Sequence, residues 1–183
     1  AALVDPDGGR TEVAAQKLFK KTGKRPRLES DMRRVFDDKE IDAVAIATTN
    51  HWHTLTAIWA MQAGKDAYVE KPVSHNIWEG RKLVECARKH NRVCQGGTQR
   101  RSWGRFRKLV DIIHSGAIGD IYQAKWVFPG NRDSIGFKPI EKPPSWLNWD
   151  LWLGPVPEQP YHGNLVHYNW HWFWDFGNGE LGN

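Results

Sequence analysis

The chain has 183 residues, of which 40% are hydrophobic and 26% are charged, and its formal net charge is +5. This is the composition of a globular protein, and the length suffices for one domain, or one and a part. No apolar run reaches the roughly 18 residues of a membrane span. The start shows no signal-peptide pattern. We therefore expect no membrane partner and a cytoplasmic location by default, or a periplasmic one if an export signal lay upstream of Ala1.

The excess positive charge is concentrated in two segments, residues 20–27 and residues 100–108. A groove for nucleic acid is one interpretation of these segments. A solvated loop and a solvated helix face explain them more simply, and an anionic cofactor would account for some of the charge. We favour the solvated surfaces and expect no nucleic-acid partner.

Short apolar runs alternate with helical patterns along the first 97 residues. Strands are expected at 1–5, 41–47, 66–70 and 92–95, and helices at 11–21, 32–36, 54–63 and 76–90. The run at 41–47 is apolar enough to predict a strand buried on both faces, and the last helix is expected to turn Ile77, Leu83, Val84 and Ala87 inward. Links of this length and type form parallel βαβ units. We predict an α/β domain over residues 1–97, built on a doubly wound parallel sheet.

The pattern changes after residue 97. A helix is expected at 103–115 and a strand at 121–128. Beyond Pro129 the sequence is rich in Pro, Gly, Asn and Trp, without a clear period. Residues 98–183 are therefore expected to begin a second domain with long loops.

Polar residues stand where the expected strands end. Ligands of open α/β sheets bind at the carboxyl ends of the strands, and the residues presented there are Asp5, Thr48, Thr49, Asn50, His51, Glu70, Lys71, Pro72, Gln99 and Arg100. Hydroxyl and amide groups in such a place suit ribose and phosphate oxygens. Lys71, beside a nicotinamide ring, could polarise or deprotonate a substrate hydroxyl. For Glu70, Lys71 and Pro72 the plain alternative is a surface loop with an ion pair.

Asp5 suggests dinucleotide binding. In such domains an acid at the end of the second strand hydrogen-bonds the adenosine ribose, about 20 residues after a glycine-rich phosphate loop. No room for that loop exists upstream of Asp5. Either Asp5 is only a turn residue, or the chain is a fragment without its first strand; the pattern of elements favours the fragment. An acid here repels a 2′-phosphate and favours NAD, although Arg10 leaves NADP open.

Six of the eleven tryptophans lie between Trp146 and Trp174. Core packing is their default interpretation, and a wall of indoles that stacks on sugar rings, including Trp170 and Trp172, is the alternative. Histidines also cluster in this region, and the spacing of His167 and His171 fits one helix face. No carboxylate or Cys completes a ligand set with them, so we expect no metal site.

Several motifs occur together in an order that resembles a known family. They are Asp5-Pro6-Asp7, Ile46-Ala47-Thr48-Thr49-Asn50-His51-Trp52-His53, Ala63-Gly64-Lys65-Asp66, Glu70-Lys71-Pro72, Gly97-Thr98-Gln99-Arg100-Arg101-Ser102 and Ser115-Gly116-Ala117-Ile118-Gly119. The set is similar to the Gfo/Idh/MocA superfamily, which includes glucose–fructose oxidoreductase and inositol dehydrogenase. Residues 149–155 and 172–175 resemble one bacterial branch of it.

The resemblance implies a Rossmann-type domain, followed by an α/β domain with an open, largely antiparallel sheet. It implies a nicotinamide cofactor, a sugar or cyclitol substrate, and a homo-oligomer for the full-length protein. By position, Lys71 matches the active-site lysine, and Arg100, Trp170 and Trp172 are candidate substrate residues. The candidate cofactor residues are Asp5, Thr48, Thr49, Asn50, His53, Glu70, Lys71, Pro72 and Gln99.

The chain departs from the family pattern at both ends. The glycine loop is absent at the start, and the acid–histidine motif that follows a segment like residues 177–182 is absent at the end. We therefore expect the parent protein to be an NAD(P)-dependent oxidoreductase acting on CH–OH groups, and this chain alone to be inactive. The alternatives are an NAD-dependent glycosidase, which oxidises its substrate transiently and eliminates the glycoside, and a non-catalytic binding remnant.

Overall fold

The computed structural model describes residues 1–127, 130 and 132–182. These residues form two compact units. The first combines Ala1–Gly97 with Phe137–Asn183, and the second is Thr98–Gly136. No helix in the described part of the chain is both long and apolar enough to cross a membrane.

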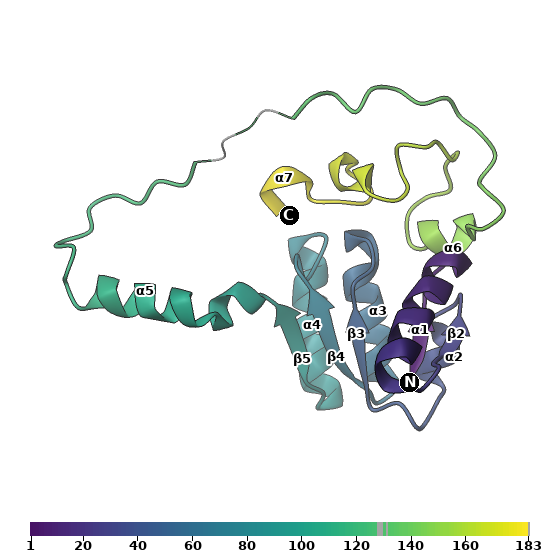
Figure 1. The fold of residues 1–183 in the computed structure, drawn as a ribbon, viewed down its shortest axis with the longest axis horizontal. Coiled ribbons are helices and arrows are strands. Elements are labelled where there is room, and N and C mark those ends of the chain that lie inside the picture. The colour runs from purple at the N-terminus through teal and green to yellow at the C-terminus, as the bar shows by residue number, and fades with distance from the viewer. Residues whose placement is uncertain (128–129, 131, 183) are drawn as a thin grey trace. The chain divides into compact units, whose positions relative to one another are not determined.

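The first unit is an α/β structure in which every strand pairing is parallel (Figure 1). One sheet pairs β1 (Ala2–Val4) with β2 (Arg27–Glu29), and the other has the order β3 (Ala43–Ile46), β4 (Asp66–Glu70), β5 (Cys94–Gly97). Helices connect the strands: α1 (Gly8–Thr22), α2 (Arg33–Phe36), α3 (Asn50–Gln62) and α4 (Ile77–His90). This alternation confirms the predicted fold class.

Local sequence signals set the ends of the long helices. Asp7 caps α1, and its carboxylate accepts hydrogen bonds from the Gly9 and Arg10 amides at 2.8 and 3.2 Å. Helix α1 ends at Gly23, whose φ of 70° lies in the left-handed region that glycine adopts at little cost. The Asn76 side chain caps α4 by accepting from the Glu79 amide at 2.9 Å.

Two hydrophobic clusters hold the first unit together. In the first, side chains of α3 and α4 pack on one face of the three-stranded sheet; its buried members are Ile46, Ala57, Met61, Ala67, Val69, Leu83 and Cys86. The second lies in residues 146–182, called the tryptophan-rich segment here, and contains Leu147, Trp152, Leu153, Tyr161, Leu165, Trp170 and Phe176. Core packing therefore accounts for part of the tryptophan content.

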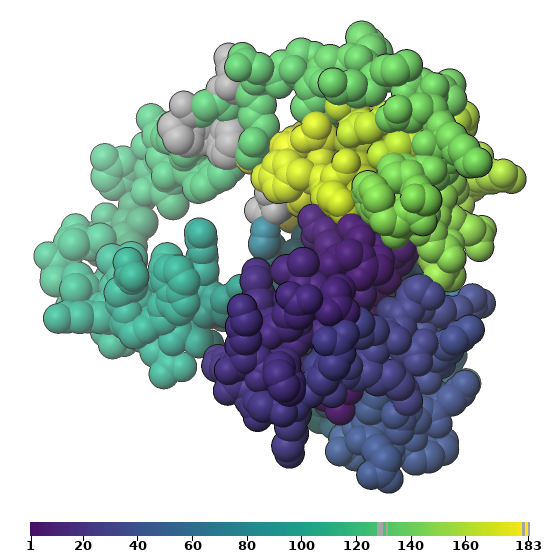
Figure 2. Space-filling view, turned by 45° about the vertical axis from the view of Figure 1, so that its right-hand side comes forward, coloured from purple at the N-terminus to yellow at the C-terminus, as the bar shows by residue number. Residues whose placement is uncertain are grey.

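The tryptophan-rich segment carries three short helices, α6 (Trp149–Leu153), η2 (Asn169–Trp172) and α7 (Gly179–Gly182). It lies against the N-terminal residues (Figure 2), where the Asn148 amide donates to the Pro6 carbonyl at 3.0 Å and the His51 amide donates to the Phe176 carbonyl at 3.3 Å. Residues 137–182 thus pack with residues 1–97.

The second unit contains η1 (Gln99–Ser102) and α5 (Gly104–His114). The strand expected at 121–128 is not formed by residues 121–127, and Phe128 lies outside the described residues. A strand is stable only when a neighbour pairs with it, and within the described residues none pairs with this segment.

Strand β2 was not among the expected strands, because only one of its three residues is apolar. Two further expectations were wrong. Strand β3 is not buried on both faces, since Ala43 and Ala45 are exposed. Ile77 and Val84 do not turn inward: they are 87% and 43% exposed, whereas Leu83 is 4% exposed. Helical periodicity therefore identified the inward face of α4 correctly at Leu83 and at the partly buried Ala87, but it predicted that face to be too wide.

Candidate functional site

The site candidates of the first unit stand at the carboxyl ends of its parallel strands. Asp5 follows β1, Thr48 and Thr49 follow β3, Glu70 ends β4, and Gly97 ends β5. The register aligns the ends of β3, β4 and β5, because Ile46 pairs with Val69, and Glu70 pairs with Gly97. Strand β1 pairs with β2 in the other sheet, and Asp5 lines the same cavity as Thr48 and Thr49. This edge is where open parallel sheets bind ligands.

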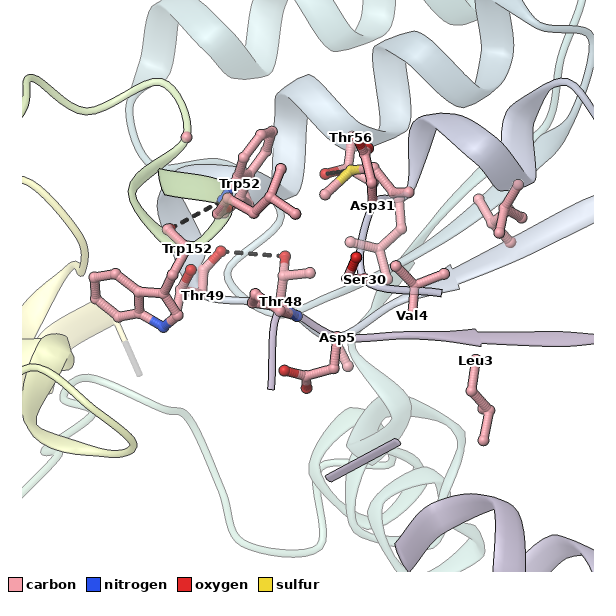
Figure 3. Close-up of a pocket in the computed structure, with 18 of the residues that line it drawn as sticks. Leu3, Val4, Asp5, Ser30, Asp31, Thr48, Thr49, Trp52, Thr56 and Trp152 are labelled. Atoms are coloured by element: carbon pink, nitrogen blue, oxygen red, sulfur yellow. Dashed lines mark hydrogen bonds between the residues drawn. The ribbon is translucent and has the colours of Figure 1, made fainter. Parts of the chain in front are cut away.

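A cavity of about 960 Å³ opens at this edge and continues between β1 and β3. Asp5, Thr48 and Thr49 line its polar end, with Ser30 and Asp31 close by (Figure 3). Consecutive residues of both strands line the cavity, from Ala1 to Asp7 and from Ala43 to Thr49. Because successive side chains alternate between faces, an unbroken run means that the backbone edge of each strand faces the cavity.

The Asp5 carboxylate is held in place by its own turn. Its Oδ1 accepts a hydrogen bond from the Asp7 amide at 2.9 Å. Burial raises the pKa of Asp5 above its ordinary value, and the Asp7 amide and the Arg10 charge oppose that rise. A carboxylate fixed beside two threonine hydroxyls offers both acceptors and donors, which fits the hydroxyl groups of a ribose.

The Asp7 side chain, which is 6% exposed, already accepts hydrogen bonds from the free backbone amides of Gly9 and Arg10 at the N-terminus of α1. A capped helix start has fewer free amides for an anion. The other Asp7 oxygen, Oδ2, lies 3.4 Å from His167 Nε2 and 3.8 Å from Arg10 Nε. Burial lowers the pKa of His167.

Hydrogen bonds tie the start of α3 to the C-terminal segment. Asn50 is 3% exposed, and its amide donates to Asn178 Oδ1 at 3.0 Å. Asn178 in turn donates to the His75 carbonyl at 2.7 Å. The His51 ring, packed against the Phe176 ring, lies with Nε2 3.1 Å from the Trp152 carbonyl, and burial lowers its pKa to about 4.

Lys71 follows the end of β4, and its side chain is exposed. Its amide donates to Glu70 Oε2 at 3.2 Å. The Tyr68 hydroxyl donates to Glu70 Oε1 at 3.4 Å. The Glu70 carboxylate therefore accepts one hydrogen bond from β4, through Tyr68, and one from the turn that carries Lys71.

His53 lies beneath this turn rather than on the cavity wall. Its side chain is 1% exposed, with Nδ1 2.6 Å from the Pro72 carbonyl and Nε2 3.0 Å from the Thr48 carbonyl. The cofactor role assigned to His53 from sequence therefore stays a prediction, and the side chain contacts protein groups on both sides.

The remaining sequence candidates come from other segments of the chain. Gln99 and Arg100 are exposed residues of η1, in the second unit. Trp170 is 8% exposed in the second hydrophobic cluster and also lines the cavity. Trp172 is half-buried, and its ring packs edge-on against the Tyr168 ring at 5.4 Å.

Sequence reasoning missed two contributors to the site. Asp7 was noted only as part of a motif, and His167 only as a candidate metal ligand. The two are 160 positions apart and lie 3.4 Å from each other. No local spacing signals such a contact. His167 and His171 do not share a helix face either, because η2 begins only at Asn169. Among the described residues, no three His, Cys, Asp or Glu side chains are grouped closely enough to hold a metal ion.

Parallel strands joined by helices, with polar residues gathered at their carboxyl ends, define a Rossmann-like nucleotide-binding fold. The chain belongs to the Gfo/Idh/MocA oxidoreductase family. Residues 1–98 match the family's NAD-binding Rossmann fold, and residues 105–183 match its C-terminal alpha/beta domain. The resemblance inferred from the motifs is thereby confirmed.

Several relatives are named for polyol or sugar substrates. The chain is similar to inositol 2-dehydrogenase 2 of Saccharopolyspora erythraea, with 31% identity over 65% of this chain and 34% of the relative. It is also similar to levoglucosan dehydrogenase of Pseudarthrobacter phenanthrenivorans, with 35% identity over 50% of this chain and 24% of the relative. The crystal structure of myo-inositol 2-dehydrogenase from Lactobacillus plantarum superposes with a TM-score of 0.57 and 26% identity, over 66% of this chain and 34% of that one.

The chain spans about a third or less of the length of these relatives.

Proposed function

We propose that the protein carrying this chain transfers a hydride between a nicotinamide dinucleotide and a ring hydroxyl of a sugar or cyclitol. The observation that carries the proposal is the shared strand edge, where Asp5, Thr48 and Lys71 follow the ends of three parallel strands. Membership of an oxidoreductase family, with inositol dehydrogenases among the relatives, supports it.

The cofactor would lie along this edge. Asp5 would accept hydrogen bonds from the adenosine ribose, and the Thr48 and Thr49 hydroxyls would donate to oxygens of the dinucleotide. We further propose NAD rather than NADP, because Asp5 and Asp7 put two carboxylates at the end of β1, and a 2′-phosphate there would be repelled. Residues 1–97 would form the cofactor domain, and residues 98–183 would belong to the substrate domain.

Lys71 would accept the proton of the substrate hydroxyl. A bound nicotinamide ring supplies the acceptor for the hydride that leaves the substrate carbon. The hydroxyl on that carbon must lose its proton in the same oxidation, and the Lys71 side chain at the end of β4, in its neutral amine form, can accept that proton and pass it to water. The role of the chain is thus to hold two reactants at one edge and to move one proton.

The test is a substrate screen on the protein expressed over its whole reading frame. Wild type and Lys71→Met are incubated with NAD and with inositols or aldoses, and the absorbance of the reduced nicotinamide is followed. We expect growth of that band with at least one polyol in wild type, and a loss of at least about a hundredfold in Lys71→Met. Both variants should bind NAD.

Two outcomes would contradict the proposal. Bound NAD with no reduction by any polyol would favour a binding protein without turnover. Release of p-nitrophenol from a p-nitrophenyl glycoside, without net reduced NAD, would favour a glycosidase that oxidises its substrate only transiently.

A further inference from the structure

The His53 ring bridges two backbone segments that sequence separates by 24 residues. Nδ1 lies 2.6 Å from the Pro72 carbonyl oxygen, and Nε2 lies 3.0 Å from the Thr48 carbonyl oxygen. The ring is 1% exposed, so water does not compete for either contact. Carbonyl oxygens only accept hydrogen bonds, so the ring donates to each of them when both nitrogens carry a proton, and to one when it is neutral.

The first segment ends at the cavity. Thr48 and Thr49 follow β3 and line the cavity beside Asp5. The contact between this turn and His53 is made by the Thr48 carbonyl oxygen, which lies 3.0 Å from Nε2 of the ring. Any shift of the His53 ring therefore changes the position of the turn that carries both hydroxyls.

The second segment carries the lysine. On its N-terminal side, Glu70 is held by the sheet, where it pairs with Gly97. A Cβ at Gly97 would lie only 2.9 Å from Glu70 Cα, so the two strands are packed without spare room. On the C-terminal side, His53 holds the Pro72 carbonyl at 2.6 Å, and the neighbouring Thr54 hydroxyl donates to the Val73 carbonyl at 3.5 Å. The backbone of Lys71 is thus fixed from both directions.

We propose that His53 is a positioning residue, which sets the placement of Lys71 relative to the Thr48–Thr49 turn by lying in contact with the Thr48 and Pro72 carbonyls and donating a hydrogen bond to at least one of them. Its place in the first turn of α3 suits this role, because α3 is anchored in the hydrophobic core by Ala57 and Met61. Because α3 is fixed by the core, the His53 ring has a fixed position, and its contacts hold the two turns at a set distance from each other. The proposal rests on the proposed function in one respect, that Lys71 and Thr48 serve one reaction.

The experiment compares three variants by hydrogen–deuterium exchange of backbone amides. His53→Ala removes both contacts, His53→Gln keeps an amide that can donate, and Met61→Ala is the control. Met61 is fully buried in the same helix, within the core and away from the two turns. Its truncation lowers global stability without touching either carbonyl.

We expect His53→Ala to raise amide exchange in residues 47–51 and 71–76 by roughly tenfold or more relative to the amides of β4. His53→Gln should restore part of the protection, and Met61→Ala should raise exchange in β4 and in the turns alike. The proposal is overturned if His53→Ala and Met61→Ala give the same uniform pattern. It is also overturned if the turns stay as protected in His53→Ala as in wild type.

A second readout uses turnover. With the polyol identified in the substrate screen, His53→Ala should lower kcat by about tenfold or more, and His53→Gln should recover part of it. Unchanged kcat in His53→Ala would overturn the proposal. Should wild type turn over no polyol, the proposed function fails while the exchange experiment still decides the role of His53.

Discussion

Asp5 is the residue on which the assignment of the cofactor depends most. It follows β1, lines the cavity, and is oriented by the Asp7 amide at 2.9 Å. Its position could be predicted from the sequence, since an acid after an apolar run is a local pattern. The neighbourhood of Asp5 could not, because it includes His167, which is 162 positions away in the sequence and lies 3.4 Å from Asp7 Oδ2.

Replacing Asp5 by Asn should weaken NAD binding by about 10- to 100-fold, because a charged acceptor for ribose hydroxyls is lost. The same change should narrow the preference for NAD over NADP. Asp42→Asn is a matched control, since Asp42 is exposed at the amino end of β3, the opposite edge of the sheet. Titration calorimetry with both dinucleotides measures the effect. Equal NAD affinity in Asp5→Asn and wild type would remove Asp5 from the cofactor site.

His51 should make stability depend on pH. Burial lowers its pKa from 6.5 to about 4, so between these values the unfolded chain binds a proton that the folded chain excludes. The free energy of unfolding should therefore fall as the pH falls through this window, by about 3 kcal/mol when the window is fully crossed.

Denaturant titrations of wild type and His51→Gln at pH values from 7 down to about 4 test this expectation. The glutamine amide can still donate to the Trp152 carbonyl but does not titrate, so His51→Gln should lose stability less steeply than wild type. Identical slopes in the two proteins would show that His51 does not titrate in this window.

At the scale of elements, strands with an apolar run and helices with clear periodicity were predictable. Strand β4 and the capped start of α4 at Asn76 agree with the structure. Strand β2 was missed because its partner β1, rather than its own composition, makes it a strand. The expected strand at 121–128 shows the reverse case, an alternating pattern for which residues 121–127 have no partner among the described strands.

Two neighbouring glycines of β5 should respond differently to substitution. A Cβ at Gly97 would meet Glu70 Cα at 2.9 Å and the Tyr68 hydroxyl at 3.0 Å, whereas a Cβ at Gly96 would meet nothing within 4 Å. Gly97→Ala should lower the free energy of unfolding by about 1–3 kcal/mol, because backbone atoms must shift. Gly96→Ala should change it by much less. Equal effects in thermal or chemical unfolding would contradict this packing.

The two facing strand edges should exchange amide protons quickly. The Asp5 amide points toward β2, and the Asp42 carbonyl points toward β4, so in parallel strands the alternate residues Val4 and Ala45 point the other way. Their amides should exchange at least about tenfold faster than that of Val69 in the central strand β4. NMR-detected exchange measures this directly, and strong protection of Val4 and Ala45 would show that their edges are covered.

At the scale of the whole molecule, the tryptophan-rich segment shares a compact unit with residues 1–97. Trp52 Nε1 donates to the carbonyls of Leu151 and Trp152, both at 3.1 Å, and Asn178 links Asn50 to His75. These contacts place residues 147–178 at the strand edge that carries Asp5 and Thr48. These contacts could not be predicted from the sequence, because contacts between distant segments leave no periodic signal.

Transfer of deuterium tests the central claim most directly. The protein, expressed over its whole reading frame, is incubated with NAD and an inositol that carries deuterium on its ring carbons, and the reduced dinucleotide is analysed by mass spectrometry. In the proposed reaction, oxidation of a ring C–OH would move the deuterium and two electrons to the nicotinamide, while the hydroxyl proton would leave through Lys71. We predict a reduced dinucleotide heavier by the mass of one deuterium in place of hydrogen. Reduced dinucleotide without deuterium, or none at all with inositols and aldoses alike, would contradict hydride transfer from a ring carbon.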